Sequence, residues 1–230
     1  MAKAIVTGMI SSENFKKEQI FAFDKDTEML KISAESLDIT AVESNEQLVD
    51  ICDCIILAVK PNALQQVLLP IKEKLCKANP LVISIAAGKS IEILLDYIGY
   101  NAAIIRVMPN INAIAAKAVS GYAASIEVTE EQIAFAKKLL SSFGKCVQVD
   151  EDRFSAYSAI AGCSPAYAYL FVDTLSRVGV KYGLSKSESL EIVTNAVINS
   201  EKNLLNSDEN SLNDVVLNAI DAAYRKDKGM

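Results

Sequence analysis

The stretch Cys54-Ile-Ile-Leu-Ala-Val-Lys-Pro61 decides the fold. Its apolar run predicts a strand that is buried on both faces, and such strands belong to parallel sheets covered by helices. Pro61 has no backbone N–H to donate, so it ends the strand, and proline fits the first turn of a following helix. Ligands of open α/β sheets bind beyond the carboxyl ends of the strands. Lys60 is therefore a cation placed where a phosphate or a carboxylate would bind.

Apolar runs and helical periodicity alternate along the chain on both sides of this strand. We expect further strands over residues 19–23, 38–41, 81–85, 103–107, 118–124 and 145–149. We expect helices over residues 2–10, 27–35, 62–74, 90–97 and 130–142, and another that begins near Asn45. Strands and helices that alternate at this spacing predict an α/β fold with a Rossmann-like doubly wound sheet over residues 1–150.

The pattern changes after Arg153, where apolar residues recur only at helical spacing. We therefore expect residues 151–230 to form an all-helical domain. Pro165 lies inside the first long helical pattern, where a proline breaks or kinks a helix. A domain this small cannot bury the apolar faces of its own helices, so we predict that they are buried against a second subunit. We expect a homodimer or a larger homo-oligomer.

Composition excludes several classes of function. The chain has 230 residues, 51% of them hydrophobic, and a net charge of -6, which argues against nucleic acid or an anionic membrane as a partner. No apolar run approaches the roughly 18 residues that span a bilayer, and we expect a cytoplasmic protein without a signal peptide. The chain contains no histidine, which excludes histidine-based catalysis and argues against a metal site. Its five cysteines form no CxxC pair, as expected for free thiols in a reducing compartment.

Four loops together resemble a known family. Ala58-Val-Lys-Pro61, Ser84-Ile-Ala-Ala-Gly88, Arg106-Val-Met-Pro-Asn110 and Gly162-Cys-Ser-Pro-Ala-Tyr167 resemble, in order, the signature loops of pyrroline-5-carboxylate reductase. The resemblance implies a Rossmann domain that binds NADP or NAD and a helical domain that carries the substrate and interlocks in a dimer. It implies the last step of proline biosynthesis, in which 1-pyrroline-5-carboxylate receives a hydride at its C=N carbon and becomes L-proline.

The resemblance also implies which residues form the site. The cofactor contacts would be Met1, Ala2, Asp24, Lys25, Asn45, Ala58, Val59, Lys60, Pro61, Ala86, Ala87 and Asn110. The substrate contacts would be Glu151, Gly162, Cys163, Ser164 and Pro165. The ring nitrogen of the imine is basic enough to arrive protonated, so we assign no catalytic acid.

Several of these residues have a second interpretation. Asp24 would favour the free 2′-hydroxyl of NAD and Lys25 the 2′-phosphate of NADP, so the two residues leave the choice of cofactor open. Asn45 could instead be an ordinary helix N-cap. Asn110 could bond the nicotinamide carboxamide or simply cap a turn. Glu151 could contact the substrate or lie in a solvated acidic turn.

Two family segments have no counterpart in the sequence. The family begins with a strand and a GxGxMA-type phosphate loop, of which Met1-Ala2 match only the last two residues. A Ser-Pro-Gly-Gly-Thr-Thr segment is missing between Leu212 and Asn213, so we expect an incomplete sequence with more than the usual ~3.8 Å between those two Cα atoms. Without the first strand, the sheet should contain a slot about 9 to 10 Å wide. The alternative is a catalytically silent homologue that serves as an oligomerising or regulatory module.

Overall fold

The computed structural model describes residues 1–206, with side-chain detail as far as residue 197. By its internal contacts the chain divides into two compact units, Met1–Pro165 and Ala166–Met230. The predicted functional boundary near residue 150 stays a prediction. Leu212 and Asn213, where we expect an omitted segment, lie outside the described residues.

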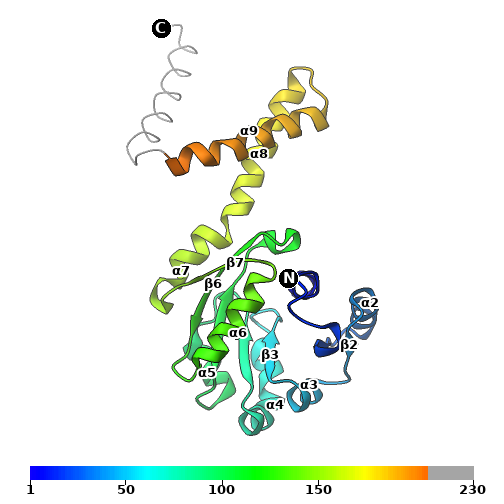
Figure 1. The fold of residues 1–230 in the computed structure, drawn as a ribbon, viewed down its shortest axis with the longest axis vertical. Coiled ribbons are helices and arrows are strands. Elements are labelled where there is room, and N and C mark those ends of the chain that lie inside the picture. The colour runs from blue at the N-terminus through cyan, green and yellow to red at the C-terminus, as the bar shows by residue number, and fades with distance from the viewer. Residues whose placement is uncertain (207–230) are drawn as a thin grey trace. The chain divides into compact units, whose positions relative to one another are not determined.

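The first unit contains the alternating elements (Figure 1). Its strands are β1 (Phe21–Ala22), β2 (Thr40–Ala41), β3 (Cys54–Leu57), β4 (Leu81–Ser84), β5 (Ile104–Met108), β6 (Ala118–Ala124) and β7 (Gly144–Gln148). Its α-helices are α1 (Ala2–Ser11), α2 (Thr27–Leu37), α3 (Asn45–Ile51), α4 (Leu64–Ala78), α5 (Ile91–Ile98), α6 (Glu130–Ser141) and α7 (Phe154–Tyr157). Three short 3₁₀ turns are η1 (Lys17–Gln19), η2 (Ile111–Ala115) and η3 (Glu151–Arg153). The predicted Rossmann-like α/β fold is confirmed.

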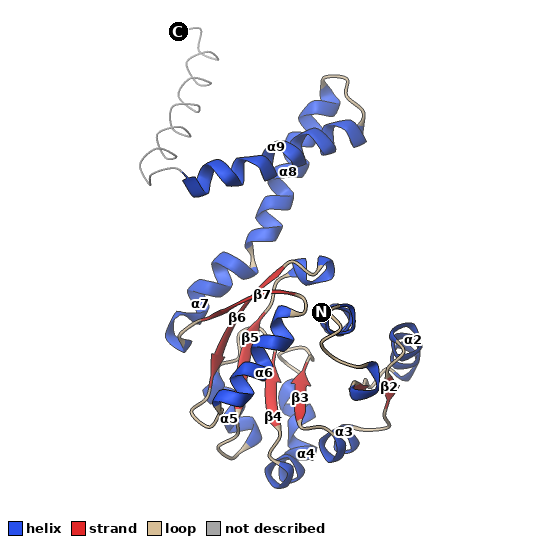
Figure 2. Ribbon diagram, viewed as in Figure 1, coloured by secondary structure: helices blue, strands red, loops and turns tan. Residues whose placement is uncertain are grey.

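The main sheet has the strand order β3-β4-β5-β6-β7 and forms the centre of the unit (Figure 2). β3, β4 and β5 are parallel to one another, as the buried apolar runs predicted. β6 is antiparallel to β5, and β7 is parallel to β6. The sheet is therefore mixed, because η2 turns the chain back along β5 without a crossover helix between the two strands.

Helices cover both faces of the main sheet, and each face has its own apolar core. On one face, Ile5 and Met9 of α1 pack with Leu139 and Leu140 of α6 over alternate residues of β4 and β5. On the other face, α3, α4 and α5 supply the core; its fully buried members include Leu64, Leu68, Leu75, Leu94 and Ile98. The side chains of a strand alternate between faces, so β4 is buried along its whole length.

The sheet is interrupted where the sequence predicted a missing strand. β1 and β2 form a separate two-stranded parallel sheet, and in the described part of the chain neither pairs with β3 (Figure 2). The predicted interruption is confirmed, while its width stays a prediction. The opening explains one correction: β3 was expected to be buried on both faces, but Cys54 and Ile56 are only partly buried.

The turn after β3 also differs from the prediction. The strand ends at Leu57, three residues before Lys60, and α4 begins at Leu64. Pro61 therefore lies in a turn, closed by a hydrogen bond from the Ala63 N–H to the Lys60 carbonyl (2.9 Å), and it does not start the helix. The pairing of β3 with β4 extends only from Cys54 to Leu57, so the chain leaves the sheet before it reaches Pro61.

The chain is helical from residue 151, as predicted. After η3 and α7 comes the π-helical turn η4 (Ser158–Gly162), followed by α8 (Ser164–Lys181) and α9 (Lys186–Asn206). Pro165 is the second residue of α8, where its missing N–H costs no helical hydrogen bond. The predicted interruption beside Pro165 is thus confirmed as a change from a π-helical turn to an α-helix.

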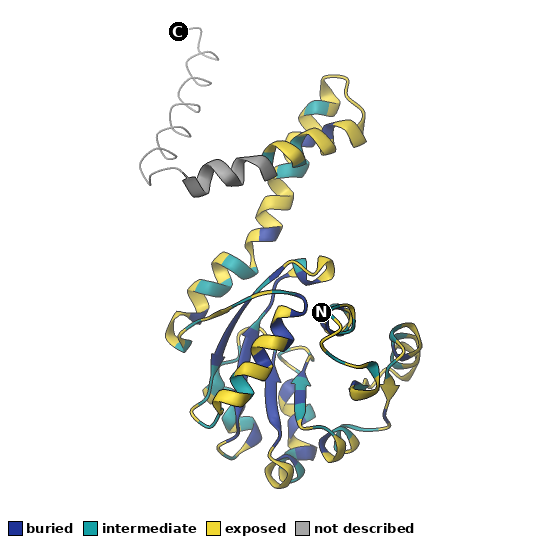
Figure 3. Ribbon diagram, in the orientation of Figure 1, coloured by how far each residue is buried: buried dark blue, intermediate teal, exposed yellow. Residues whose placement is uncertain are grey.

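Much of the described part of α8 and α9 is exposed (Figure 3), and several of its exposed residues are large and apolar. A buried hydrogen bond from the Ser189 hydroxyl to the Ser176 carbonyl (2.7 Å) joins the two helices. Outward-facing residues that are at least 40% exposed include Leu170, Phe171, Leu175, Val178, Leu190 and Ile192. Within the described residues, no helix is long and apolar enough to cross a membrane.

Candidate cofactor and substrate site

Three of the signature loops leave the main sheet at the same edge. The parallel register places Leu57 beside Ser84 and Ser84 beside Arg106, so β3, β4 and β5 reach their carboxyl ends together. Lys60, Ala86 and Asn110 follow these ends within a few residues. This is the edge at which ligands of α/β sheets bind.

The loop after β3 presents a mixture of open and packed residues. Ala58 and Lys60 are exposed, whereas Val59 and Pro61 are partly buried and hold the turn against α4. The Lys60 ammonium makes no ion pair in the described part of the chain. An unpaired cation at this edge could meet a phosphate.

The loop after β4 is short and built of small residues. Ala86 is buried and Ala87 is exposed. Gly88 has a φ of +72° and nothing within 4 Å of a built Cβ, so a side chain there would be strained by the backbone and not by crowding. Ser90 then caps α5 by accepting the N–H of Ile93 (3.2 Å). Such a loop allows a flat ring to approach the backbone.

Asn110 is the best-defined polar group at this edge. Its side chain is buried, and its Nδ2 donates to the Ala161 carbonyl of η4 (3.0 Å). Its Oδ1 is buried and has no hydrogen-bond partner. An orphaned acceptor fits the N–H of a nicotinamide carboxamide, so the residues present are compatible with this cofactor. The turn-capping interpretation is wrong, because the Asn110 side chain makes no cap bond to η2.

The same bond places the predicted substrate segment beside the end of β5. A Cβ built on Gly162 would lie 3.1 Å from Cε of Met108, so the absence of a side chain lets η4 approach the strand. The Tyr157 hydroxyl donates to the Val119 carbonyl of β6 (2.9 Å) and anchors the start of η4. A π-helical turn is rare, and such turns are frequent at functional sites.

The remaining residues of this segment differ in exposure. Cys163 and Ser164 are exposed, and Pro165 is buried. The Ser164 hydroxyl bonds back to the Ile160 carbonyl. The structure thus brings Asn110 together with residues 161–165, which we call the Gly162 segment. No hydrogen bond or ion pair joins Lys60 or Ala86 to that segment in residues 1–165. A single cleft formed by all of them stays a prediction.

Glu151 begins the 3₁₀ turn η3 and its side chain is 36% exposed, but its carboxylate is bonded to the protein. Its Oε1 accepts from Nη1 of Arg106 at 2.7 Å and from the backbone N–H of Ile91 at 3.0 Å, and its Oε2 is buried without a partner. The guanidinium carbon of Arg106 lies 4.0 Å from the centroid of the Phe154 ring. Sequence reasoning assigned no role to Arg106, although an arginine inside an apolar strand signals a buried ion pair.

The predicted adenosine-side residues lie in the region of the small sheet. Asp24 and Lys25 follow β1 and are exposed, and Oδ1 of Asp24 accepts the Asp26 N–H (3.0 Å). Asn45 is the first residue of α3 and is not its N-cap, so that interpretation was wrong: Ser44 caps the helix by accepting the Gln47 N–H (3.2 Å).

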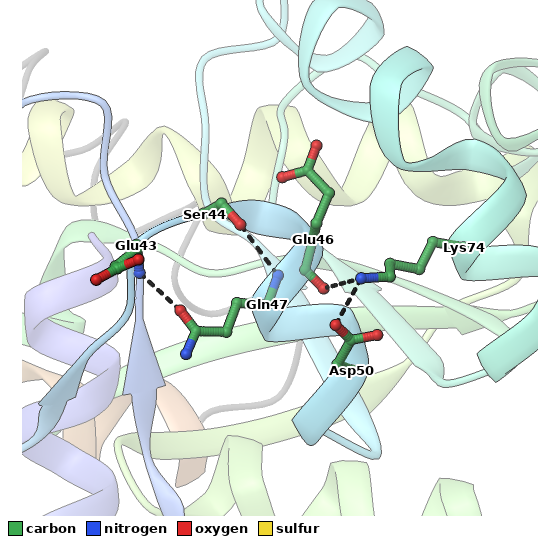
Figure 4. A network of polar contacts seen from close by, with 6 residues as sticks. All are labelled: Glu43, Ser44, Glu46, Gln47, Asp50 and Lys74. Atoms are coloured by element: carbon green, nitrogen blue, oxygen red, sulfur yellow. Dashed lines mark hydrogen bonds and ion pairs between the residues drawn. The ribbon is translucent and has the colours of Figure 1, made fainter.

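The polar contacts around α3 are structural (Figure 4). The Gln47 side chain accepts the Glu43 N–H (2.9 Å) and completes the cap of the helix. The Lys74 ammonium bridges the Glu46 carbonyl (3.2 Å) and the Asp50 carboxylate (2.5 Å), which ties α3 to α4. Asn45 takes no part in these contacts and is partly buried, and its cofactor role stays a prediction.

Met1 and Ala2 open the first helix. Met1 is the N-cap residue of α1, Ala2 is its first residue, and both are exposed. The first N–H groups of a helix have no partner within it, and they favour anions. Two surface depressions, one beside α2 and one between the ends of α4 and α5, contain none of the predicted site residues. In the described residues, no group of three or more Cys, Asp or Glu could hold a metal ion.

Comparison with known proteins agrees with this arrangement. Residues 151–217 match the family model for pyrroline-5-carboxylate reductase dimerisation, and residues 1–88 match that for coenzyme F420-dependent NADP oxidoreductase. The chain is 31% identical over 209 residues to pyrroline-5-carboxylate reductase 2 of Bacillus subtilis (strain 168), a match that covers 90% of the chain and 74% of the relative. The chain belongs to the pyrroline-5-carboxylate reductase family. It is also 30% identical to the Escherichia coli (strain K12) pyrroline-5-carboxylate reductase, over 94% of the chain and 81% of that enzyme.

Solved structures of the pyrroline-5-carboxylate reductase family share the fold. The Streptococcus pyogenes 1-pyrroline-5-carboxylate reductase superposes with a TM-score of 0.82 at 31% identity, covering 93% of the chain and 81% of that structure. The Plasmodium falciparum pyrroline carboxylate reductase, solved with NADP bound, gives a TM-score of 0.78 at 28% identity, covering 98% and 92%. The resemblance read from the four signature loops is confirmed.

Proposed function

We propose that the protein is a pyrroline-5-carboxylate reductase that uses NADPH to reduce 1-pyrroline-5-carboxylate to L-proline. The observation that carries the proposal is Asn110, which joins the end of β5 to the Gly162 segment and keeps an orphaned buried acceptor there. A cofactor group with an N–H donor at Asn110 would lie beside the segment that we assign to the imine. Family membership over most of the chain supports the same reaction.

In this proposal the small-residue loop at Ala86 and Ala87 would hold one face of the nicotinamide, and Asn110 would bond its carboxamide. Lys60 would meet the phosphates, and Met1-Ala2 at the start of α1 would lie near them. Gly162, Cys163, Ser164 and Pro165 would form the floor under the imine. The bound cofactor supplies the hydride, and the protein residues supply position.

Positioning is the main contribution of this chain's residues to the rate. A planar cyclic iminium that is held over a flat ring at van der Waals distance needs little further activation, and correct alignment can account for much of the barrier reduction. The Asn110 amide bonds the main chain of η4, and Gly162 faces the Met108 side chain, so we assign no general acid here. An iminium that arrives protonated needs none.

We propose NADP as the preferred cofactor and a cytoplasmic homodimer as the working form. Lys25 is exposed at the end of β1 and makes no ion pair in the described residues, so it can meet a 2′-phosphate, whereas Asp24 already accepts the Asp26 N–H. The match of residues 151–217 to the family's dimerisation model supports self-association. The apolar faces of α8 and α9 would supply the dimer contact.

Cofactor oxidation tests the proposed reaction directly. Protein expressed from the complete gene is incubated with NADPH and pyrroline-5-carboxylate, and absorbance at 340 nm is followed. We expect oxidation of the cofactor that requires both the imine and the protein. If NADPH is not oxidised while the protein still self-associates, the silent-homologue alternative replaces the reductase.

Asn110 variants test the site. Asn110→Ala removes both amide functions, and we expect NADPH affinity to fall about tenfold, as for the loss of one well-placed hydrogen bond of about 1.4 kcal/mol. Asn101→Ala, an exposed asparagine before β5, is the matched control and should bind NADPH normally. Affinity is measured by nicotinamide fluorescence without the imine. Equal affinity of both variants would remove Asn110 from the cofactor site.

A further inference from the structure

Arg106 is a buried cation in the main sheet. Arg106 of β5 is 9% exposed, and its Nη1 lies 2.7 Å from Oε1 of Glu151. Its guanidinium stacks on the ring of Phe154, which is 1% exposed. A charge in such surroundings is tolerated only when it is paired and hydrogen-bonded, so Arg106 depends on Glu151.

The same carboxylate oxygen also holds the start of a helix. Oε1 of Glu151 accepts the N–H of Ile91, the first residue of α5, at 3.0 Å. The loop over residues 85–90 precedes α5 and follows Ser84, the last residue of β4. Ser84 is the main-chain register partner of Arg106 in the pairing of β4 with β5. Main-chain pairing of β4 with β5 therefore fixes the start of the loop over residues 85–90. The Glu151 carboxylate, which Arg106 holds, fixes its end at Ile91.

We propose that Arg106 and Glu151 are positioning residues for the loop over residues 85–90. The proposal rests on the proposed function, which places Ala86 and Ala87 of this loop at the nicotinamide. Glu151 acts through Arg106 and Ile91 and does not contact the imine. A role as a substrate ligand would use its Oε2, which is buried and has no partner. The two roles predict different changes when Glu151 is replaced.

Hydrogen exchange of the protein without any ligand tests the structural half of the proposal. Glu151→Gln keeps the shape and the acceptor for Ile91 but removes the charge, and Arg106→Met removes the guanidinium. We expect both variants to lose amide protection in peptides covering residues 85–95. The double variant should lose no more than the worse single variant, because both residues act as one unit.

Asp150→Asn is the matched control. Asp150 is next to Glu151 in sequence, but its side chain is 73% exposed and lies 3.9 Å from the exposed Arg153, so its replacement should leave the exchange unchanged. If Arg106→Met does not fold, Arg106→Lys takes its place. Lysine keeps the charge but cannot stack as a planar group on Phe154, so we expect a partial loss of amide protection. Protection equal to wild type in Glu151→Gln overturns the proposal.

Binding and kinetics test the functional half. For Glu151→Gln we expect the Kd for NADPH, measured by fluorescence without the imine, to rise about tenfold. We expect the KM for pyrroline-5-carboxylate to change less than about twofold. The opposite result, a raised KM for the imine with an unchanged Kd for NADPH, assigns Glu151 to the substrate and refutes its positioning role. If the wild type neither binds NADPH nor reduces the imine, the proposed function fails, and the exchange experiment still judges the ion pair.

Discussion

Replacement of Gly8 by alanine offers the sharpest test of how α1 packs in this fold. A Cβ built on Gly8 would lie 2.6 Å from Cβ of Phe143, 3.0 Å from the Ser142 carbonyl oxygen and 3.2 Å from Cα of Phe143. All three atoms belong to the backbone or to its first side-chain carbon, so no rotamer change relieves the contact. Phe143 is itself fully buried. The helix must therefore move away from the turn between α6 and β7 to admit one methyl group.

The magnitude follows from two opposing effects. Overpacking a rigid contact costs about 1 to 3 kcal/mol, and a distance of 2.6 Å places Gly8→Ala in the upper part of that range. Alanine is better than glycine in a helix interior by about 1 kcal/mol. We expect a net loss of about 1 to 2 kcal/mol in the free energy of unfolding. For a domain of this size, that corresponds to a fall in Tm of about 2 to 8 °C.

Thermal unfolding followed by circular dichroism measures this effect. All variants are compared at one protein concentration, because self-association adds to apparent stability. Thr7→Ala, on the exposed face of the same helix, is the matched control and should raise the free energy of unfolding by about 0.5 kcal/mol through helix propensity alone. If Gly8→Ala is stabilising to the same extent as Thr7→Ala, then α1 does not make this close contact.

Three further predictions concern the cofactor, pH and assembly. Lys25→Glu should weaken NADPH binding about tenfold and leave NADH binding unchanged, measured by fluorescence titration; equal effects on both would exclude a 2′-phosphate contact. Burial raises the pKa of the Cys54 thiol from 9.0 to about 12 in the folded protein. The unfolded chain therefore loses the thiol proton at lower pH than the folded protein does. The free energy of unfolding falls as pH rises above 9.0, by at most about 1.4 kcal/mol per pH unit. Urea denaturation at pH 8, 9 and 10 should show this decline in the wild type and a smaller one in Cys54→Ala. Phe171→Glu, at a residue 58% exposed on α8, should shift the protein to a monomer in light scattering, whereas an unchanged oligomer places the contact elsewhere.

The sequence by itself determined the elements and their class. A strand that is buried on both faces is a short apolar run, as in Leu81–Ser84. A helix that is buried along one stripe has apolar residues at helical spacing, as in α6. Both patterns can be recognised in the sequence alone. The four signature loops indicated the family, and the sequence contains no counterpart of the family's phosphate loop before Met1-Ala2. The interruption of the sheet beside β3 followed from that absence alone.

Only the tertiary structure decided how distant residues are used. Arg106 and Glu151 are 45 positions apart, and Asn110 and Ala161 are 51 apart, so no local pattern records that each pair is bonded. The antiparallel direction of β6 likewise depends on how η2 turns against the end of β5. Local sequence sets backbone preferences, whereas these bonds form only after the sheet and its helices bury the groups from water, which makes an unpaired charge or amide costly.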